Sequence, residues 1–264
     1  MNKKRKIIVA AIIGLAALGG TIYHFANEKK AYDYSDFYVV ETPTQKEEIK
    51  EDEKQPEMVL SLSLLKEVNP DVVGILEFDD RAIYEPIVQA PDNEYYVRKN
   101  IDREYEAAGI PFISYDGYIY SKNVVIYGHS STRSNIIFTP LMNYLDESYY
   151  NEHPTFTFET LGEKRTYEIF SVFVHDTKDI NSSLEFTQSD WRKDAEFDVY
   201  VKQTKLRSIY ETSAEVSKDD KLMTLVTCDT RNDNKRIVIL AKRTDKFKKS
   251  INSWNVNGSM LLFN

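Results

Sequence analysis

The chain has 264 residues, which is enough for one sizeable domain with appendages, and its formal net charge is −8 at pH 7. A negative chain is a poor partner for nucleic acid, because phosphate backbones attract basic surfaces. The single cysteine excludes an internal disulfide and a zinc site built from several cysteines. We therefore expect no metal and no cofactor, and look for chemistry in individual side chains.

A basic cluster and an uncharged run open the chain. Residues 1–6 hold three lysines and one arginine, and residues 7–26 contain no Asp, Glu, Lys or Arg. A helix of that length crosses a hydrocarbon core of about 30 Å. The basic flank predicts a single-pass membrane anchor with residues 1–6 in the cytoplasm and the rest of the chain outside. A cleaved signal peptide is the alternative, but the run is long for one and no clear small-x-small site follows.

The composition then divides the chain into a linker, a domain and a tail. Residues 27–57 are polar and charge-dense, which predicts a linker that holds the domain off the membrane. From Met58, apolar residues at helical spacing predict a short amphipathic helix that ends near Asn69-Pro70. The domain is predicted to span residues 58–243. The extension 244–264 is basic and then apolar, and a packed segment, a membrane-surface contact and disorder all remain open for it.

Many short strands separated by turn signals follow this helix, and they predict an all-β barrel or sandwich. The predicted strands are residues 72–78, 83–89, 110–115, 123–127, 155–159, 165–174, 221–226 and 237–241. Residues 140–150 are predicted to be helical. A second, longer helix is predicted over residues 187–210, because apolar residues recur there at roughly helical spacing among charges, as on a helix that packs on the barrel surface.

Two reactive side chains stand at the ends of predicted strands. Cys228 ends a buried strand, directly before a polar loop, and Arg236 begins the strand after that loop. His129 also follows a strand, after Gly128, which permits a sharp turn. A nucleophilic thiol belongs where substrate can reach it, and it needs a base or a cation to ionise it. We therefore predict that Cys228, His129 and Arg236 form one active site, against the alternative of a buried and inert cysteine.

These residues resemble the motifs of sortases, the cysteine transpeptidases of Gram-positive cell surfaces. Thr224–Cys228 is similar to the family's TLxTC signature, Tyr127–His129 to its histidine motif, and Lys235–Val238 to the strand that carries its arginine. The resemblance extends from about residue 60 to residue 242 and is strongest to class B. It implies a mainly β fold: a closed sortase-type barrel with an N-terminal helix and a long helix inserted before the strand that ends in the catalytic cysteine.

The resemblance also implies roles for the three residues. Cys228 attacks a backbone carbonyl of a peptide and forms a thioacyl-enzyme. His129 acts as general acid and base, and Arg236 donates hydrogen bonds to the oxyanion or to the neighbouring substrate backbone. Arg231 is a rival for the arginine role, but it lies within the loop, where an arginine is usually a solvated charge.

The expected substrates are surface proteins with a C-terminal sorting motif, cleaved after threonine and joined to an amine of a peptidoglycan precursor. The motif is NPxTN-like or a variant such as SPxTG or NPxTG. Four residues match positions that bind substrate in the family: Asn93, Val97, Thr177 and Thr227. Val226 stands where class B enzymes often have serine, and Ser130 stands where asparagine or histidine is common. These departures leave the motif preference open.

Other functions remain open from the sequence. A thiol peptidase would use the same thioacyl intermediate but pass it mainly to water. A non-catalytic, membrane-anchored β-barrel binding domain would have an unreactive Cys228. Within sortases, the chain has no Asp-Pro dipeptide of the kind found in the lids of pilus-polymerising members, which favours anchoring of surface proteins over polymerisation.

Overall fold

The computed structural model describes residues 32–41, 57–133, 136–179 and 184–245. The predicted anchor, residues 7–26, lies outside these ranges, as do residues 42–56 of the linker and residues 246–264. Among the described residues, no helix combines the length and the apolar character that crossing a bilayer requires.

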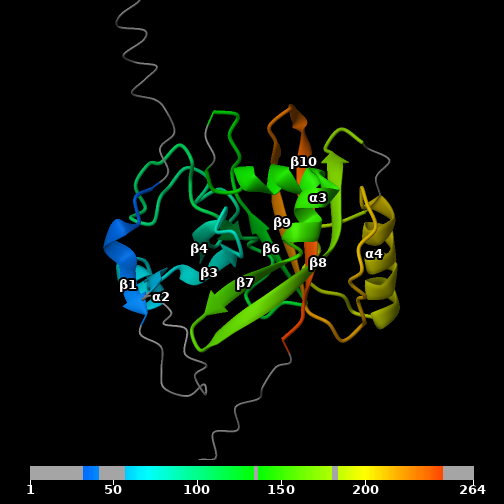
Figure 1. The fold of residues 1–264 in the computed structure, drawn as a ribbon, viewed down its shortest axis with the longest axis horizontal. Helices are drawn as coiled ribbons and strands as arrows, with labels where there is room; N and C mark the ends of the chain where they lie inside the picture. The colour runs from blue at the N-terminus through cyan, green and yellow to red at the C-terminus, as the bar shows by residue number, and fades with distance from the viewer. Residues whose placement is uncertain (1–31, 42–56, 134–135, 180–183, 246–264) are drawn as a thin grey trace, which may run out of the picture.

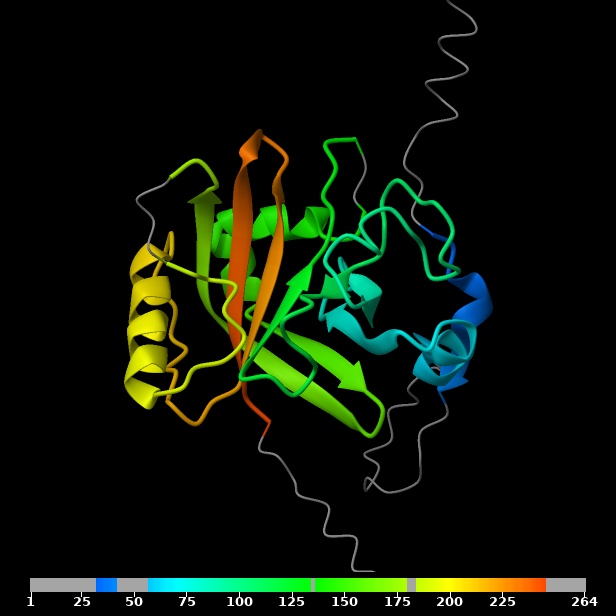
Figure 2. The same ribbon diagram turned by 180° about the vertical axis from the view of Figure 1, so that it is seen from behind.

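Eight strands close into a barrel (Figures 1 and 2) in the order β10-β8-β7-β3-β4-β5-β6-β9. Their bounds are β3 (Val72–Phe78), β4 (Tyr84–Gln89), β5 (Phe112–Ile113), β6 (Asn123–Tyr127), β7 (Thr155–Thr160), β8 (Glu163–Asp176), β9 (Leu222–Asp229) and β10 (Asn232–Arg243). Two pairs, β4–β5 and β6–β9, are parallel and the others are antiparallel. The predicted mainly β fold with a closed barrel is confirmed, although the strand predicted at 110–115 keeps only two ladder residues.

β10 is buried on both faces, which explains its uninterrupted apolar run. All residues of Ile237–Ala241 are fully buried. Ile237 and Ile239 belong to the apolar cluster inside the barrel, whereas Val238 belongs to a second cluster that includes Phe197 of helix α4. Because side chains alternate along a strand, one face of β10 supports the barrel core and the other supports the helix.

Helix α4 (Asp194–Arg207) is the long helix predicted before the cysteine strand, and it packs on the outside of the barrel (Figure 1). It begins seven residues later than the predicted range 187–210. The reason is that the preceding backbone serves another element: the Asn123 backbone N–H donates to the Ser189 carbonyl at 3.0 Å, and the Asn123 side chain donates to the Gln188 carbonyl at 2.9 Å. Because these two carbonyls bond to β6, this segment stays irregular and the helix begins only at Asp194.

The N-terminal end of the predicted linker is part of the folded domain. β1 (Tyr38–Glu41) pairs with β2 (Glu57–Leu60) as an antiparallel ribbon. The short 3₁₀ helix η1 (Ser35–Phe37) precedes β1, and the Phe37 side chain is buried in an apolar cluster. The folded domain therefore begins before the boundary predicted at residue 58. β1 and β2 are separated by residues 42–56 in the sequence, so a local sequence pattern does not reveal their pairing.

The predicted N-terminal helix is present as α2 (Leu62–Val68), which starts four residues after Met58. Ser61 marks this start, since its side-chain oxygen accepts a hydrogen bond from the Leu64 backbone N–H at 3.4 Å. A serine at this position satisfies one of the N–H groups that a helix leaves unpaired at its beginning. Leu65 is fully buried and fixes the helix to the domain.

The predicted helix over 140–150 divides into two elements, the 3₁₀ helix η2 (Thr139–Leu145) and α3 (Glu147–Glu152). Asp146 separates them, because its extended backbone ends η2 and its carboxylate accepts from the Ser148 N–H at 2.9 Å to cap α3. Leu141 and Tyr144 of η2 pack into the main apolar cluster.

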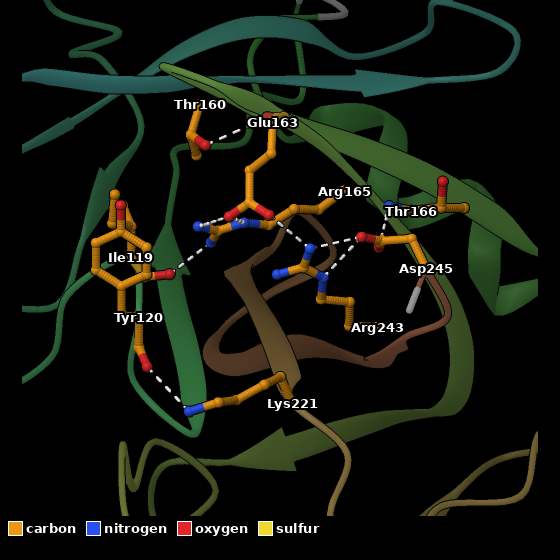
Figure 3. Close-up of polar contacts among 9 residues, drawn as sticks. All are labelled: Ile119, Tyr120, Thr160, Glu163, Arg165, Thr166, Lys221, Arg243 and Asp245. Carbon is orange, nitrogen blue, oxygen red and sulfur yellow. Dashed lines mark hydrogen bonds and ion pairs between the residues drawn. The ribbon is translucent and has the colours of Figure 1, made fainter. Parts of the chain in front are cut away.

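A polar network closes the end of the barrel at which β10 finishes (Figure 3). Arg165 on β8 is 2% exposed, and its Nε donates to Glu163 Oε1 at 2.7 Å. Its Nη1 donates to the carbonyl of Ile119, and its Nη2 lies 2.6 Å from the same Glu163 oxygen without hydrogen-bond geometry. The guanidinium therefore joins β8 to the loop between β5 and β6.

The same network extends past the predicted domain end at residue 243. Arg243 Nη2 donates to the second oxygen of Glu163 at 2.7 Å, and its Nε donates to Asp245 at 2.9 Å. Asp245 in turn accepts from the backbone N–H of Thr166 at 2.9 Å. Residues 244 and 245 thus belong to the barrel rather than to a separate extension, since their hydrogen bonds complete its closing end (Figure 3).

We predict that Arg165→Ala lowers the free energy of unfolding by about 3 kcal/mol, because it leaves the Ile119 carbonyl and a Glu163 carboxylate oxygen without the partner that the buried guanidinium supplies. Denaturant titration of the purified protein measures this change. The matched control is Lys164→Ala, whose ammonium is half exposed and pairs with Glu77 at 2.8 Å; its expected cost is under about 1 kcal/mol. Equal midpoints for the two variants would contradict a structural role for the network.

Glu85 is an ionisable residue on the barrel-facing side of β4. Its register partner on β3 is Leu76, which is fully buried in the main cluster. By strand alternation it shares its face with Ile83 and Ile87, which are members of the same cluster. Burial raises the pKa of the Glu85 carboxyl to about 8. The folded chain therefore holds a proton that the unfolded chain releases between its ordinary pKa of 4.5 and about 8.

Because the folded state binds more protons in this window, stability falls as pH rises from about 4.5 to 8. We predict that Glu85→Gln reduces this loss by a few kcal/mol, at about 1.4 kcal/mol per unit of pKa shift. Urea titrations at pH 5, 6.5 and 8 give the comparison, with the exposed Glu67→Gln as control. Parallel pH profiles for wild type and Glu85→Gln would show that Glu85 does not titrate in this range.

Candidate active site

One cavity, of about 440 Å³, collects every residue that the sequence analysis assigned to the site. It is lined by Asn93, Val97, Ile110, Phe112, Tyr127, Gly128, His129, His175, Thr177, Phe186, Thr187, Val226, Thr227, Cys228 and Arg236. A larger cavity, of about 880 Å³, lies beside α4 and has neither cysteine nor histidine in its lining. The smaller cavity is therefore the candidate active site.

The parallel pairing of β6 with β9 brings the histidine to the cysteine. The ladder runs from Asn123 opposite Leu222 to Tyr127 opposite Val226. Continuing this register by two residues places His129 opposite Cys228. Parallel neighbours end at the same edge of a sheet, so two segments that are distant in sequence present their functional side chains together.

Arg236 reaches the same place from the other side of β9. It is the antiparallel register partner of Cys228, and directly opposite residues project from the same face of a sheet. Its Nη1 donates to the carbonyl oxygens of Asp233 and Lys235, each at 2.9 Å. Since both hydrogen bonds to the described residues come from Nη1, the donors on Nε and Nη2 are left for a bound group.

The rival Arg231 is held by Asp229 and does not line the cavity. Its Nε and Nη2 donate to the two carboxylate oxygens of Asp229 at 2.9 and 2.8 Å. This bidentate pair holds the pKa of the Asp229 carboxyl below its usual range. The strand predicted from residue 237 in fact begins at Asn232, so the predicted loop is a short hairpin with an irregularity before Arg236.

His129 is oriented by a backbone group. Its Nε2 lies 2.9 Å from the carbonyl oxygen of Val97. A carbonyl only accepts hydrogen bonds, so in this contact Nε2 carries the proton. Val97 was predicted from the family resemblance to bind substrate; the structure shows in addition that its main chain holds the histidine ring.

Hydrogen bonds of Gly128 and Thr227 connect the ends of β6 and β9. The Gly128 N–H donates to the Val226 carbonyl at 3.1 Å, and the Thr227 hydroxyl donates to the Gly128 carbonyl at 2.8 Å. A Cβ on Gly128 would lie 2.6 Å from the ring of Phe138, so only glycine fits here. Thr227 is 2% exposed, and its hydroxyl is used within the protein.

The remaining two predicted residues, Asn93 and Thr177, also line the cavity. The Asn93 side-chain oxygen accepts from the Tyr115 N–H at 2.8 Å. The Thr177 hydroxyl donates to the carbonyl of Asn234 at 2.8 Å, which ties the end of β8 to β10. Both side chains are therefore held by the main chain while they line the cavity.

Sequence reasoning missed part of the cavity wall. His175, which the sequence analysis did not assign to the site, lines the cavity and is the register partner of Arg236 on β8. Its ring lies 4.7 Å from that of Phe186, in the segment before α4. The predicted strand that carries Arg236 could have indicated His175. A strand inside a sheet has a neighbour on each edge, and the residue paired with Arg236 on the edge away from Cys228 projects from the same face. Phe186 lies in an irregular segment and gave no such signal.

The groups available for chemistry are therefore a thiol, an imidazole and a guanidinium around one cavity. Across the ranges that the structure describes, no three His, Cys, Asp or Glu side chains gather in a way that could hold a metal ion. The arrangement fits nucleophilic acyl transfer, in which a thiol attacks, an imidazole moves protons and a cationic donor receives the oxyanion.

Comparison with known proteins agrees with this chemistry. The sortase domain model matches residues 87–244. The chain is 33% identical to sortase B of Listeria monocytogenes over 186 residues, which cover 69% of this chain and 73% of that protein. It is 28% identical to sortase B of Staphylococcus aureus over 182 residues, covering 67% and 72%.

Solved structures show the same fold. The crystal structure of Clostridium perfringens sortase B aligns with a TM-score of 0.65 at 28% identity, over 70% of this chain and all of that one. A Staphylococcus aureus sortase B–substrate complex aligns with a TM-score of 0.63 at 27% identity, over 70% and 84%. The chain therefore belongs to the sortase family of cysteine transpeptidases, and within that family to class B.

Proposed function

We propose that this enzyme cleaves a C-terminal sorting motif after threonine and transfers the threonine carbonyl to an amine of a peptidoglycan precursor. Cys228 is the nucleophile, His129 the general acid and base, and Arg236 the oxyanion donor. The observation that carries this assignment is the pairing of β9 with its two neighbours. The β6–β9 register, continued by two residues, aligns Cys228 with His129, and the β9–β10 register pairs Cys228 with Arg236.

In the first half of the reaction His129 Nδ1 takes the proton of the Cys228 thiol, which gives a thiolate and an imidazolium. The thiolate sulfur attacks the threonine carbonyl carbon, a C–S bond forms, and the carbonyl electron pair moves onto oxygen. The free donors of Arg236 receive this charge, which develops only in the transition state and intermediate. When the intermediate collapses, the C–N bond breaks, and the departing nitrogen takes a proton from the imidazolium of His129. The product is a thioacyl-enzyme and a released peptide.

The second half runs in reverse with a different amine. The incoming amine attacks the thioacyl carbon, loses a proton to His129, and expels the thiolate. The contact with Val97 keeps the proton on Nε2 throughout, so Nδ1 is the nitrogen that gives and accepts protons. Because one ring nitrogen remains on a fixed carbonyl, the imidazole keeps its orientation in both halves of the reaction.

The proposed substrate is an extended peptide that lies in the cavity lined by Asn93, Val97 and Thr177. NPxTN-like motifs, or variants such as NPxTG and SPxTG, are the candidates. Two solved structures support peptide and amine chemistry at such a site: one sortase B has been solved with a substrate, and a sortase B structure has also been solved with triglycine.

We further propose that residues 7–26 anchor the enzyme in the cell membrane, with residues 1–6 in the cytoplasm and the catalytic domain outside. The support is the uncharged run behind a basic flank. In this arrangement residues 27–31 connect the anchor to the folded domain, which lies outside the membrane where surface proteins and cell-wall precursors meet.

We predict that the full chain in detergent cleaves at least one peptide of a panel with NPxTN, NPxTG, SPxTG and LPxTG motifs. Mass spectrometry should show cleavage after threonine, a ligated product that requires added triglycine, and neither product with Cys228→Ala. Cleavage without ligation to any amine would instead establish a thiol peptidase. Absence of cleavage, together with a Cys228 that resists alkylation, would establish a non-catalytic domain.

We predict that Arg236→Ala lowers kcat/KM by two to three orders of magnitude, because an oxyanion donor contributes on the order of 3 kcal/mol. Arg236→Lys should recover only part of this activity, since an ammonium lacks the planar fork. The matched control is Arg231→Ala in the same hairpin. It should lower the melting temperature, because it leaves the buried Asp229 carboxylate unpaired, but keep kcat/KM within about tenfold. Near-wild-type turnover by Arg236→Ala would refute its role.

A further inference from the structure

The catalytic ends of β6 and β9 are joined by few contacts. Their backbone ladder ends at Tyr127 opposite Val226, with one more bond from the Gly128 N–H. Beyond that point, two side-chain hydroxyls continue the connection among the described residues. The Thr227 hydroxyl donates to the Gly128 carbonyl at 2.8 Å, and the Ser130 hydroxyl donates to the Cys228 carbonyl at 2.7 Å.

The Ser130 contact joins the two catalytic residues through their neighbours and main chain. Ser130 directly follows His129, and its acceptor is the carbonyl of the residue that carries the thiol. The loop is held on both sides of Ser130: the Phe138 N–H donates to the His129 carbonyl at 3.0 Å, and the Ser131 N–H donates to the Thr139 hydroxyl at 2.9 Å. The Ser130 hydroxyl is therefore the link from a fixed loop to the end of β9.

The burial of the two hydroxyls separates their roles. Thr227 is almost completely buried, so its removal would leave the Gly128 carbonyl without a partner and water could not replace it. Ser130 and Cys228 are only half-buried. If the Ser130 hydroxyl is removed, water can solvate the Cys228 carbonyl, so the fold is retained while the alignment of the strand ends is lost.

We propose that Ser130 is a positioning residue whose hydroxyl fixes the placement of the Cys228 thiol relative to the His129 imidazole. This inference rests on the proposed roles of Cys228 and His129. Reacting groups must be held within a fraction of an ångström, and a misplacement of about 1 Å costs on the order of 100-fold in rate. A nearby cation also stabilises the thiolate, and this stabilisation weakens as the distance between them grows. A looser placement therefore favours the neutral thiol.

Other charged and titratable groups near the thiol do not depend on Ser130. They are Tyr127 on β6, His175 on β8, Arg236 on β10 and the Asp229–Arg231 pair that follows in the hairpin. Each is placed by its own strand or by its own partner. A change caused by Ser130 therefore reports on the distance between the thiol and His129.

The test compares Ser130→Ala, Ser130→Thr and Ser131→Ala in the full chain. We expect Ser130→Ala to lower kcat by 10- to 100-fold with KM within about twofold, and to move the half-maximal pH of Cys228 alkylation by iodoacetamide upward. Ser130→Thr keeps the hydroxyl and should restore both properties. Ser131→Ala removes a side chain that accepts from the exposed Arg133 N–H and should behave as wild type.

Wild-type kcat and alkylation profile in Ser130→Ala would overturn the proposal. A fall in melting temperature of more than about 8 °C, with kcat and KM both impaired, would assign Ser130 a structural role instead. The alkylation profile needs no peptide substrate. It therefore decides the role of Ser130 even if the wild-type chain cleaves no sorting peptide, which is the result that would overturn the proposed function separately.

Discussion

The parallel pairing of β6 with β9 is the constraint on which the active site depends. The two strands are separated in sequence by η2, α3, β7, β8 and α4, so their register joins segments that are far apart in the chain. A slip of one residue would turn every side chain of a strand to the opposite face and move Cys228 away from His129. Burial on both faces fixes this register, since Val125 faces one apolar cluster and Ile126 the other.

β10 adds the second constraint, because it pairs with β8 on one edge and β9 on the other. Its central residues support the barrel core and α4 at once, which makes it one of the least movable strands of the fold. Arg236 begins this buried segment. The Arg236 guanidinium is thereby placed beside Cys228, and its hydrogen bonds to its own hairpin leave the donors on Nε and Nη2 for a bound group.

One end of the barrel is closed by a polar network that stabilises the fold, and the other end carries the active site. At the end where β10 finishes, Arg165 and Arg243 share Glu163 in a network that closes the barrel (Figure 3). At the catalytic end, backbone carbonyls and hydroxyls hold His129 and Cys228, and a cavity stays open between them. A polar network is suited to the closed end because each member finds its partner there, whereas the open end must keep donors for substrate.

The sequence by itself predicted an all-β barrel or sandwich, which the resemblance to sortases narrowed to a closed barrel. It also predicted the bounds of β3 and β6 and proposed Cys228, His129 and Arg236 as one site. Strand periodicity and short motifs are local, so they can be recognised in a linear chain. Only the tertiary structure decided the pairing of β1 with β2, the late start of α4, the capture of Arg231 by Asp229, and the hydrogen bonds that orient His129 and join Ser130 to Cys228. Most of these contacts depend on partners far apart in sequence, and even the Arg231–Asp229 pair forms only in the hairpin, so no local pattern of residues specifies them.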